Sequence, residues 1–201
     1  MDQRIAARHF AISGYTQHRG RMSGLMRVSM NLEQALPSTH RVHLCRWNED
    51  WWEWAEYVWL LWQEAGGPQP VINLYAYSYG MGWGAIQLSR ELQRRGMGVN
   101  HIVSCDGVYR HPYRLGAWRA LWPWSTILVP SNVGRVTYFY QRRNLPSGHE
   151  IVAEDSDATN IKPGPGAHGG AAGEIIAAHQ YADDSTLFRS TAIEVARSVA
   201  A

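Results

Sequence analysis

Ser78 lies in the segment YAYSYGMGWG (residues 75–84), directly after an apolar run and directly before a helical pattern. A serine at the carboxyl end of a buried parallel strand reaches the edge where open α/β sheets bind ligands. If a tight turn points the serine outward, the residues two before and two after it must be small. Ala76 and Gly80 meet this requirement and give the pattern A-x-S-x-G. The segment therefore predicts a nucleophilic serine, and a plain Ser/Gly turn at a helix start is the alternative.

This pattern between a strand and a helix resembles the α/β-hydrolase fold, lipases and cutinases in particular. The resemblance implies a serine hydrolase that cleaves an ester or thioester of a small-molecule acyl substrate through an acyl-enzyme, without a cofactor. It also implies that the acid follows the serine along the chain and that the histidine comes last. A dinucleotide-binding loop fits poorly, because residues 80–84 read G-x-G-x-G and lack the third glycine of G-x-G-x-x-G at its proper spacing.

The predicted acid is Asp106, which ends the next apolar run, in IVSCDG (residues 102–107). The resemblance to some lipases supports this position, because they carry the acid after the corresponding strand. An Asp-Gly turn whose carboxylate caps local backbone is the structural alternative. Asp155 and Asp157 compete for the role, since many other members of the fold carry the acid after a later strand.

The predicted base is His179, in IIAAHQYADDS, and its main competitor is His168, in GPGAHGGAAG. Members of the family often carry the histidine in a segment like H-x-x-I-D, which residues 179–183 resemble with alanine in place of the larger aliphatic residue. The flanking residues anchor a short loop at both ends, which suits a preorganised base. We expect one His179 ring nitrogen near Ser78 Oγ and the other near Asp106. The weaker candidates are His111 and His149.

The oxyanion hole needs two donors aimed at the developing negative charge. One is predicted to be the backbone N–H of Tyr79. By resemblance, the other is the backbone N–H of Tyr15, which follows Ser13-Gly14 where lipases often read His-Gly. Aromatic residues near the serine and in the Trp-rich insert after Asp106 either line the acyl pocket or add a packing layer: Tyr77, Tyr109, Tyr113, Trp118, Trp122 and Trp124.

The elements that must position these residues alternate along a single domain of residues 1–201. Strand patterns cover residues 8–13, 40–47, 70–77, 101–107, 126–130, 135–141 and 149–154, with a short helix as an alternative within residues 131–143. Helical patterns cover residues 22–36, 49–64, 82–96 and 183–200, and Asp184 or Ser185 is the expected cap of the last one. The Gly/Pro/Ala stretch of residues 163–173 is an expected loop. The alternation predicts an α/β fold with a mostly parallel sheet and helices on both faces.

Tryptophan is unusually frequent, with 10 among the 201 residues. In the helical pattern of residues 49–64, Trp52 and Trp59 fall outside the predicted core face, and they are either exposed or, as we expect, covered by a neighbouring element. That core face comprises Trp51, Trp54, Ala55, Val58, Leu61 and Trp62.

Composition gives no indication of a nucleic-acid or membrane partner. The net charge of +2 calls for neither nucleic acid nor an anionic membrane as a partner. No apolar run approaches the ~20 residues of a membrane span, and the charged N-terminus is unlike a signal peptide, so a cytoplasmic protein is the expectation. The two cysteines, Cys45 and Cys105, lie in apolar runs and are expected to be reduced core residues.

Three functions stay open at this level. A serine esterase leads, and no metal-ligand motif competes with it, since the sequence has neither H-E-x-x-H nor C-x-x-C. An amidase or peptidase with the same triad is the first alternative, because the sequence does not separate leaving groups. A catalytically inactive binding module is the second. The sequence does not indicate an oligomeric state.

Overall fold

The computed structural model describes residues 4–15, 17, 22–109, 125–141, 145–154, 161–163 and 179–200. Its main sheet has six strands in the order β2-β1-β3-β4-β6-β8, and each neighbouring pair is parallel. The strands are β1 (Ala7–Ile12), β2 (His40–Cys45), β3 (Val71–Tyr77), β4 (His101–Cys105), β6 (Val136–Phe139) and β8 (Ile161–Pro163). All carboxyl ends therefore meet at one edge, which is where Ser78 and Asp106 were expected.

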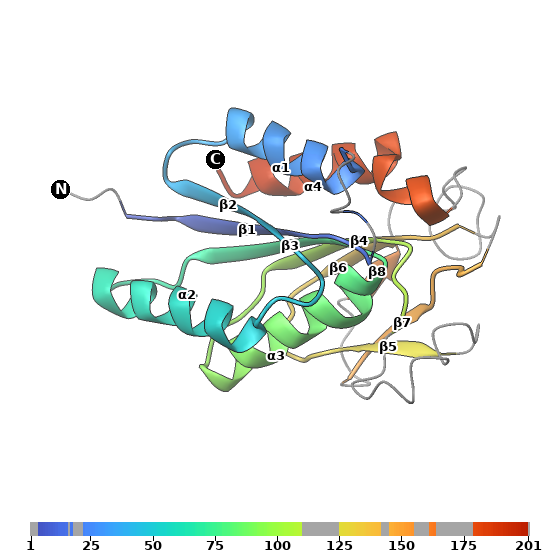
Figure 1. The fold of residues 1–201 in the computed structure, drawn as a ribbon. Coiled ribbons are helices and arrows are strands. Elements are labelled where there is room, and N and C mark those ends of the chain that lie inside the picture. Colours follow the sequence, from blue (N-terminus) through green and yellow to red (C-terminus); the bar gives the residue numbers. More distant parts are fainter. Residues whose placement is uncertain are drawn as a thin grey trace.

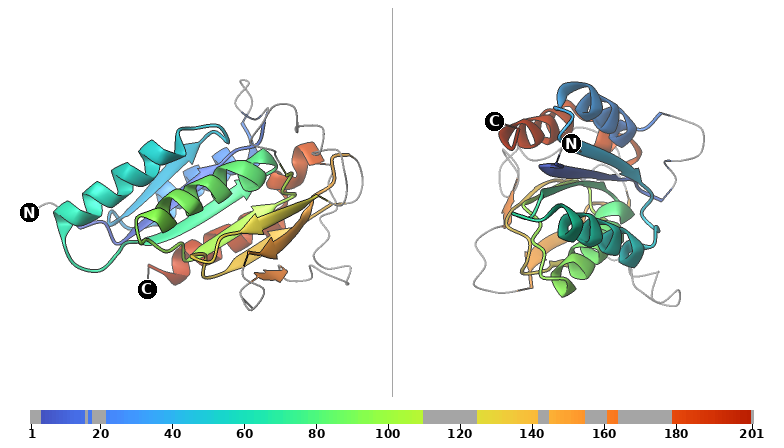
Figure 2. Two further views of the ribbon diagram at one scale, coloured as in Figure 1. Left: turned by 90° about the horizontal axis from the view of Figure 1, so that it is seen from below. Right: turned by 90° about the vertical axis from the view of Figure 1, so that its left-hand side faces the viewer.

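Helices cover both faces of the sheet (Figures 1 and 2). On one face lie α1 (Gly24–Ala35) and α4 (Thr186–Ser198), and on the other lie α2 (Trp51–Ala65) and α3 (Ile86–Arg94). Successive strand residues point to opposite faces. Phe10 accordingly joins the core cluster beneath α2 and α3, whereas Ala11 joins the cluster beneath α1 and α4. The predicted α/β class with a mostly parallel sheet is confirmed.

Side-chain caps fix where three of these helices begin. Ser23 accepts a hydrogen bond from the Met26 N–H at the start of α1, and Asp50 accepts from two N–H groups at the start of α2. Ser185 accepts from the Phe188 N–H at 3.2 Å, so it is the cap of α4. Among the described residues, no helix is long and apolar enough to cross a membrane.

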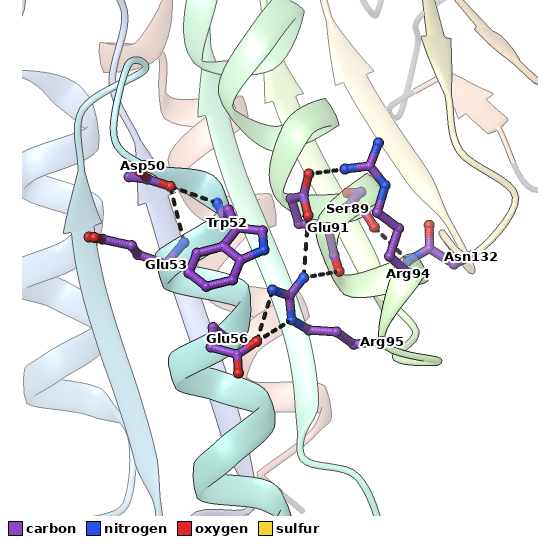
Figure 3. Close-up of polar contacts among 9 residues, drawn as sticks. All are labelled: Asp50, Trp52, Glu53, Glu56, Ser89, Glu91, Arg94, Arg95 and Asn132. Carbon is purple, nitrogen blue, oxygen red and sulfur yellow. Dashed lines mark hydrogen bonds and ion pairs between the residues drawn. The ribbon is translucent and has the colours of Figure 1, made fainter.

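The outer surfaces of α2 and α3 are joined by Arg95 (Figure 3). Its guanidinium lies 2.9 Å from Glu56 of α2 and 3.3 Å from Glu91 of α3, and 5.3 Å from the Trp52 ring centroid.

Trp52 is nevertheless 56% exposed, so the expectation that an element covers it was wrong. Trp59 is covered, as expected, and it packs partly buried against the core cluster. Of the predicted core face, Trp51, Ala55 and Val58 are buried, while Trp54 and Trp62 are partly buried.

Three features differ from the sequence-based expectation. The strands β5 (Thr126–Val129) and β7 (Glu150–Ala153) pair with each other in a separate two-stranded sheet, because short apolar runs do not encode which sheet they join. Residues 80–85 form a π-helix, η1 (Gly80–Ala85), before α3 begins. Residue 163, at the start of the expected loop, ends strand β8, while residues 164–173 lie outside the described residues. Cys45 and Cys105 are buried and free, as predicted.

Candidate active site

Ser78 sits in the tight turn that the sequence predicts directly after β3. Its φ of +53° is in the left-handed region that few non-glycine residues adopt. The strained backbone is held by hydrogen bonds on both sides: Ser78 N–H donates to the Cys105 carbonyl at 3.2 Å. The Ser78 carbonyl accepts from Met81, Gly82 and Val108 at 3.0–3.1 Å. Surrounding structure therefore fixes the unusual conformation that directs the serine toward the carboxyl edge.

The glycines that follow Ser78 are explained by close backbone approaches. A Cβ at Gly80 would lie 2.2 Å from the Ile12 carbonyl oxygen, and one at Gly82 would lie 1.7 Å from the Val108 carbonyl oxygen. A Cβ at Gly84 would lie 2.7 Å from the Ile12 side chain. Only residues without a side chain let η1 pack directly against the end of β1 and the loop after β4.

His179 connects Ser78 to Asp106. Its Nε2 lies 3.0 Å from Ser78 Oγ, and its Nδ1 lies 2.5 Å from Asp106 Oδ2. The geometry predicted from the sequence is thus confirmed. An ionised carboxylate only accepts hydrogen bonds, so the proton of a neutral His179 is on Nδ1, and Nε2 is left to accept the Ser78 hydroxyl proton.

Asp106 is fully buried at the carboxyl end of β4. Its φ of +47° lies in the left-handed region, and its N–H donates to the Phe139 carbonyl at 2.7 Å. Gln141 donates to both carboxylate oxygens. A Cβ at Gly148 would lie 2.6 Å from Asp106 Oδ1, so glycine is needed for the carboxylate to fit.

The backbone of His179 is held by Tyr77. The Tyr77 hydroxyl donates to the His179 carbonyl at 2.5 Å, and the two rings lie 5.0 Å apart between centroids. Burial is the main cause that raises the pKa of Tyr77, so the phenol stays protonated and keeps its donor. Tyr77 is only 4% exposed. The sequence predicts Tyr77 as a pocket-lining candidate, whereas its burial and its contacts with His179 make it a support for that histidine.

A second set of hydrogen bonds anchors the segment that carries His179, the 3₁₀-helix η3 (His179–Asp184). Buried Asp183 accepts from the Leu25 N–H at 3.0 Å and from Gln17 Nε2 at 2.5 Å. Gln17 Oε1 in turn accepts from the Gly14 N–H at 3.0 Å. Burial raises the pKa of Asp183, and these hydrogen bonds oppose the rise. Gln17 thus ties the loop after β1 to the segment of the histidine.

The two residues predicted to form the oxyanion hole lie beside each other. The rings of Tyr15 and Tyr79 are 5.7 Å apart between centroids, and Trp47 contacts both, at 5.9 and 5.6 Å. A Cβ at Gly14 would lie 3.0 Å from Ser78 Cβ, so the loop after β1 runs against the serine. The role of the two backbone N–H groups stays a prediction. Trp47 was not anticipated at the site, although it follows the carboxyl end of β2.

The remaining candidates divide into two groups. His149 is buried, and its Nδ1 accepts the Tyr109 N–H at 2.7 Å, so it supports the loop after β4 instead of contacting Ser78 in the role of base. Tyr109 packs partly buried against the core. The others lie outside the described residues: His111, Tyr113, Trp118, Trp122, Trp124, Asp155, Asp157 and His168.

Within the described part of the chain, no group of three or more His, Cys, Asp and Glu side chains is arranged to hold a metal ion. No protein-family model matches this sequence, and a search of curated proteins finds no match either. Function is therefore inferred from the side chains that meet at the carboxyl edge.

Proposed function

We propose that this protein is a serine hydrolase with an α/β-hydrolase fold that cleaves an ester or thioester through an acyl-enzyme. The observation that carries the proposal is the continuous chain of hydrogen bonds from Ser78 through His179 to buried Asp106. A nucleophile, a base and a buried orienting acid in contact are the geometric mark of this chemistry. The strained backbone of Ser78 and its place after a parallel strand add to the support.

In the acylation step, Ser78 Oγ attacks the substrate carbonyl carbon while His179 Nε2 takes the hydroxyl proton. The carbonyl electron pair moves onto the oxygen, where the backbone N–H groups of Tyr79 and Tyr15 would stabilise the negative charge. Asp106 stabilises the imidazolium that forms. When the tetrahedral intermediate collapses, the bond to the alcohol or thiol breaks, and His179 returns the proton to that leaving group.

In the deacylation step, water takes the place of the leaving group. His179 Nε2 accepts a proton from the water as its oxygen attacks the acyl carbon, and the same proton passes to Ser78 Oγ as the acyl bond breaks. The products are a carboxylic acid and the free enzyme. Each step uses only groups of this chain and water, so the proposed hydrolysis calls for no cofactor.

The decisive experiment is labelling with a fluorophosphonate probe together with a screen of p-nitrophenyl esters of graded acyl length. Ser78→Ala is expected to abolish labelling and to lower ester hydrolysis by about 10⁴-fold, with little change in the thermal midpoint. Ser190→Ala, at an exposed serine of α4, is the matched control and should label like the natural protein. A natural protein that neither labels nor hydrolyses any ester would instead indicate a binding module.

Two further arms test the acid and the leaving group. Asp106→Asn should cut kcat strongly while the protein stays folded, because the asparagine amide holds the wrong histidine tautomer. If Asp155→Asn or Asp157→Asn causes the loss and Asp106→Asn does not, the acid lies on the later loop. Faster hydrolysis of p-nitroanilides than of matched p-nitrophenyl esters would favour an amidase.

A further inference from the structure

A cavity of ≈ 670 Å³ opens at the opposite end of the sheet from Ser78, where the strands begin. Its walls come from the start of β1, from β2, from the last turns of α2 and from the segment that precedes β3. In Figure 1 this is the end near the N-terminus, away from η3. The cavity therefore shares no residue with the proposed active site.

Arg8 is the most telling residue of this cavity. It is 4% exposed, and its guanidinium carbon lies 5.4 Å from the centroid of the Tyr57 ring. Its Nη1 lies 3.4 Å from His43 Nε2, and the Tyr57 side chain also hydrogen-bonds with Arg8. No ion pair of the described residues involves Arg8. Burial lowers the pKa of Arg8, yet a guanidinium keeps its charge.

A buried guanidinium that meets only neutral partners, here His43 and Tyr57, keeps part of its desolvation cost, which an acidic partner would offset. The other described charges of the cavity do not neutralise Arg8, because Arg4 and Arg41 also line it and Glu64 is the one acidic residue among the described residues of the lining. The described lining therefore carries three arginines and one glutamate, which gives it a net charge of +2. His43 adds none at neutral pH, since burial and the neighbouring arginines lower its pKa to about 4.

We propose that this cavity binds a small organic anion, a phosphate, phosphonate or carboxylate that carries an apolar or aromatic group. The oxyanion would pair with Arg8, and Arg41 at the rim would add a second charge. The apolar group would lie against Tyr57, Leu61 and Trp62 of α2. A volume of ≈ 670 Å³ is in the ordinary range for small-molecule sites. The proposal does not depend on the hydrolase activity.

Calorimetric titration at low ionic strength tests this site with three probes. Phenylphosphonate should bind saturably, inorganic phosphate should bind at least ~10-fold more weakly, and benzyl alcohol should not bind, because the site needs both charge and apolar contact. Added NaCl should weaken the binding of phenylphosphonate. Absence of saturable phenylphosphonate binding by the natural protein up to ~10 mM would overturn the proposal.

Substitutions at Arg8 and at Arg94 test whether phenylphosphonate binds in this cavity. Arg8→Met should weaken phenylphosphonate binding by ~10-fold or more and should change the thermal midpoint of the free protein little, because the lost contacts with His43 and Tyr57 are offset by removal of a buried charge that has no acidic partner among the described residues. Arg94→Met, at an arginine whose side chain is 70% exposed on α3, is the matched control and should bind like the natural protein. Equal losses in the two variants would indicate non-specific surface charge and contradict the proposal.

A second substitution keeps the test decisive if Arg8→Met does not fold. Arg41 is exposed at the rim, and Arg41→Gln should leave the fold intact while weakening binding by about threefold. Chemical shifts that change on titration should be those of Arg8, Arg41 and Tyr57. Shifts confined to the residues around Ser78 would show that the probe binds the proposed active site instead, and would overturn this assignment.

Discussion

Gln141 donates two hydrogen bonds to the Asp106 carboxylate, from its backbone N–H to Oδ1 at 3.3 Å and from its side-chain Nε2 to Oδ2 at 3.0 Å. The same Oδ2 accepts from His179 Nδ1. Gln141 is fully buried, and its Nε2 also contacts the Pro146 carbonyl at 3.1 Å. The glutamine therefore fixes the plane of the carboxylate that faces the imidazole.

The first prediction concerns this positioning role. Gln141→Met keeps the volume of the side chain but removes its donor, so we expect kcat for ester hydrolysis to fall about tenfold with KM little changed. Gln93→Met, on the exposed side of α3 where Gln93 contacts Ser131, is the control and should match the natural enzyme. A kcat for Gln141→Met equal to that of the control would show that the carboxylate is oriented without the glutamine.

The second prediction concerns the choice between the two late histidines. His179→Ala should lose ester hydrolysis by about 10⁴-fold, because the proton of Ser78 then has no acceptor. His168→Ala should keep most of the activity. The comparison of kcat/KM in the two variants checks this, with thermal midpoints measured alongside. The opposite result would move the base to His168 while leaving Ser78 as the nucleophile.

Local patterns were enough to predict the residues that meet at the carboxyl edge. Ser78 and Asp106 each follow a buried strand, and parallel pairing brings those strand ends together. The supporting residues Gln141, Gln17 and Trp47 were not predicted. Gln141 comes two residues after Phe139, which pairs with Cys105, so its contact with Asp106 depends on a strand order that the sequence pattern does not encode.

The elements were predicted more reliably than their connections. The strand predicted at residues 70–77 is observed at Val71–Tyr77, because a buried apolar run has a clear length. The π-helix of residues 80–85 was not predicted, since its cause is the packing of Gly80 and Gly82 against distant carbonyl groups. Contacts of this kind are tertiary, so no local periodicity reveals them.

The third prediction tests that packing. Gly82→Ala places a methyl group where the Val108 carbonyl oxygen lies, so we expect the free energy of unfolding to fall by about 3 kcal/mol and ester hydrolysis to be largely lost. Gly98→Ala is the matched control, because the nearest atom to its new Cβ is 3.6 Å away. It should change stability by no more than about 1 kcal/mol. Urea denaturation measures the free energy of unfolding of both variants. Equal values for Gly82→Ala and Gly98→Ala would contradict the prediction.

The last prediction concerns stability in acid. Burial lowers the pKa of His9 to about 3, helped by the charges of His40 and His43. It lowers the pKa of His43 to about 4, together with Arg8 and Arg41. It also lowers the pKa of His101 to about 4, together with Arg135. An unfolded chain protonates these side chains near pH 6.5.

At these three histidines the unfolded state therefore binds more protons than the folded state between about pH 4 and pH 6.5, so their contribution lowers the free energy of unfolding as the pH drops through this window. Each histidine contributes a slope of about 1.4 kcal/mol per pH unit once its unfolded form is fully protonated. His101→Gln, which retains a group able to contact Thr137 Oγ1, should reduce the slope by about that amount. Urea denaturation at pH 7.5, 6.0, 5.0 and 4.5 measures how the free energy of unfolding changes with pH in the natural protein and in His101→Gln. Equal slopes for the two proteins would show that His101 takes up its proton in the folded state.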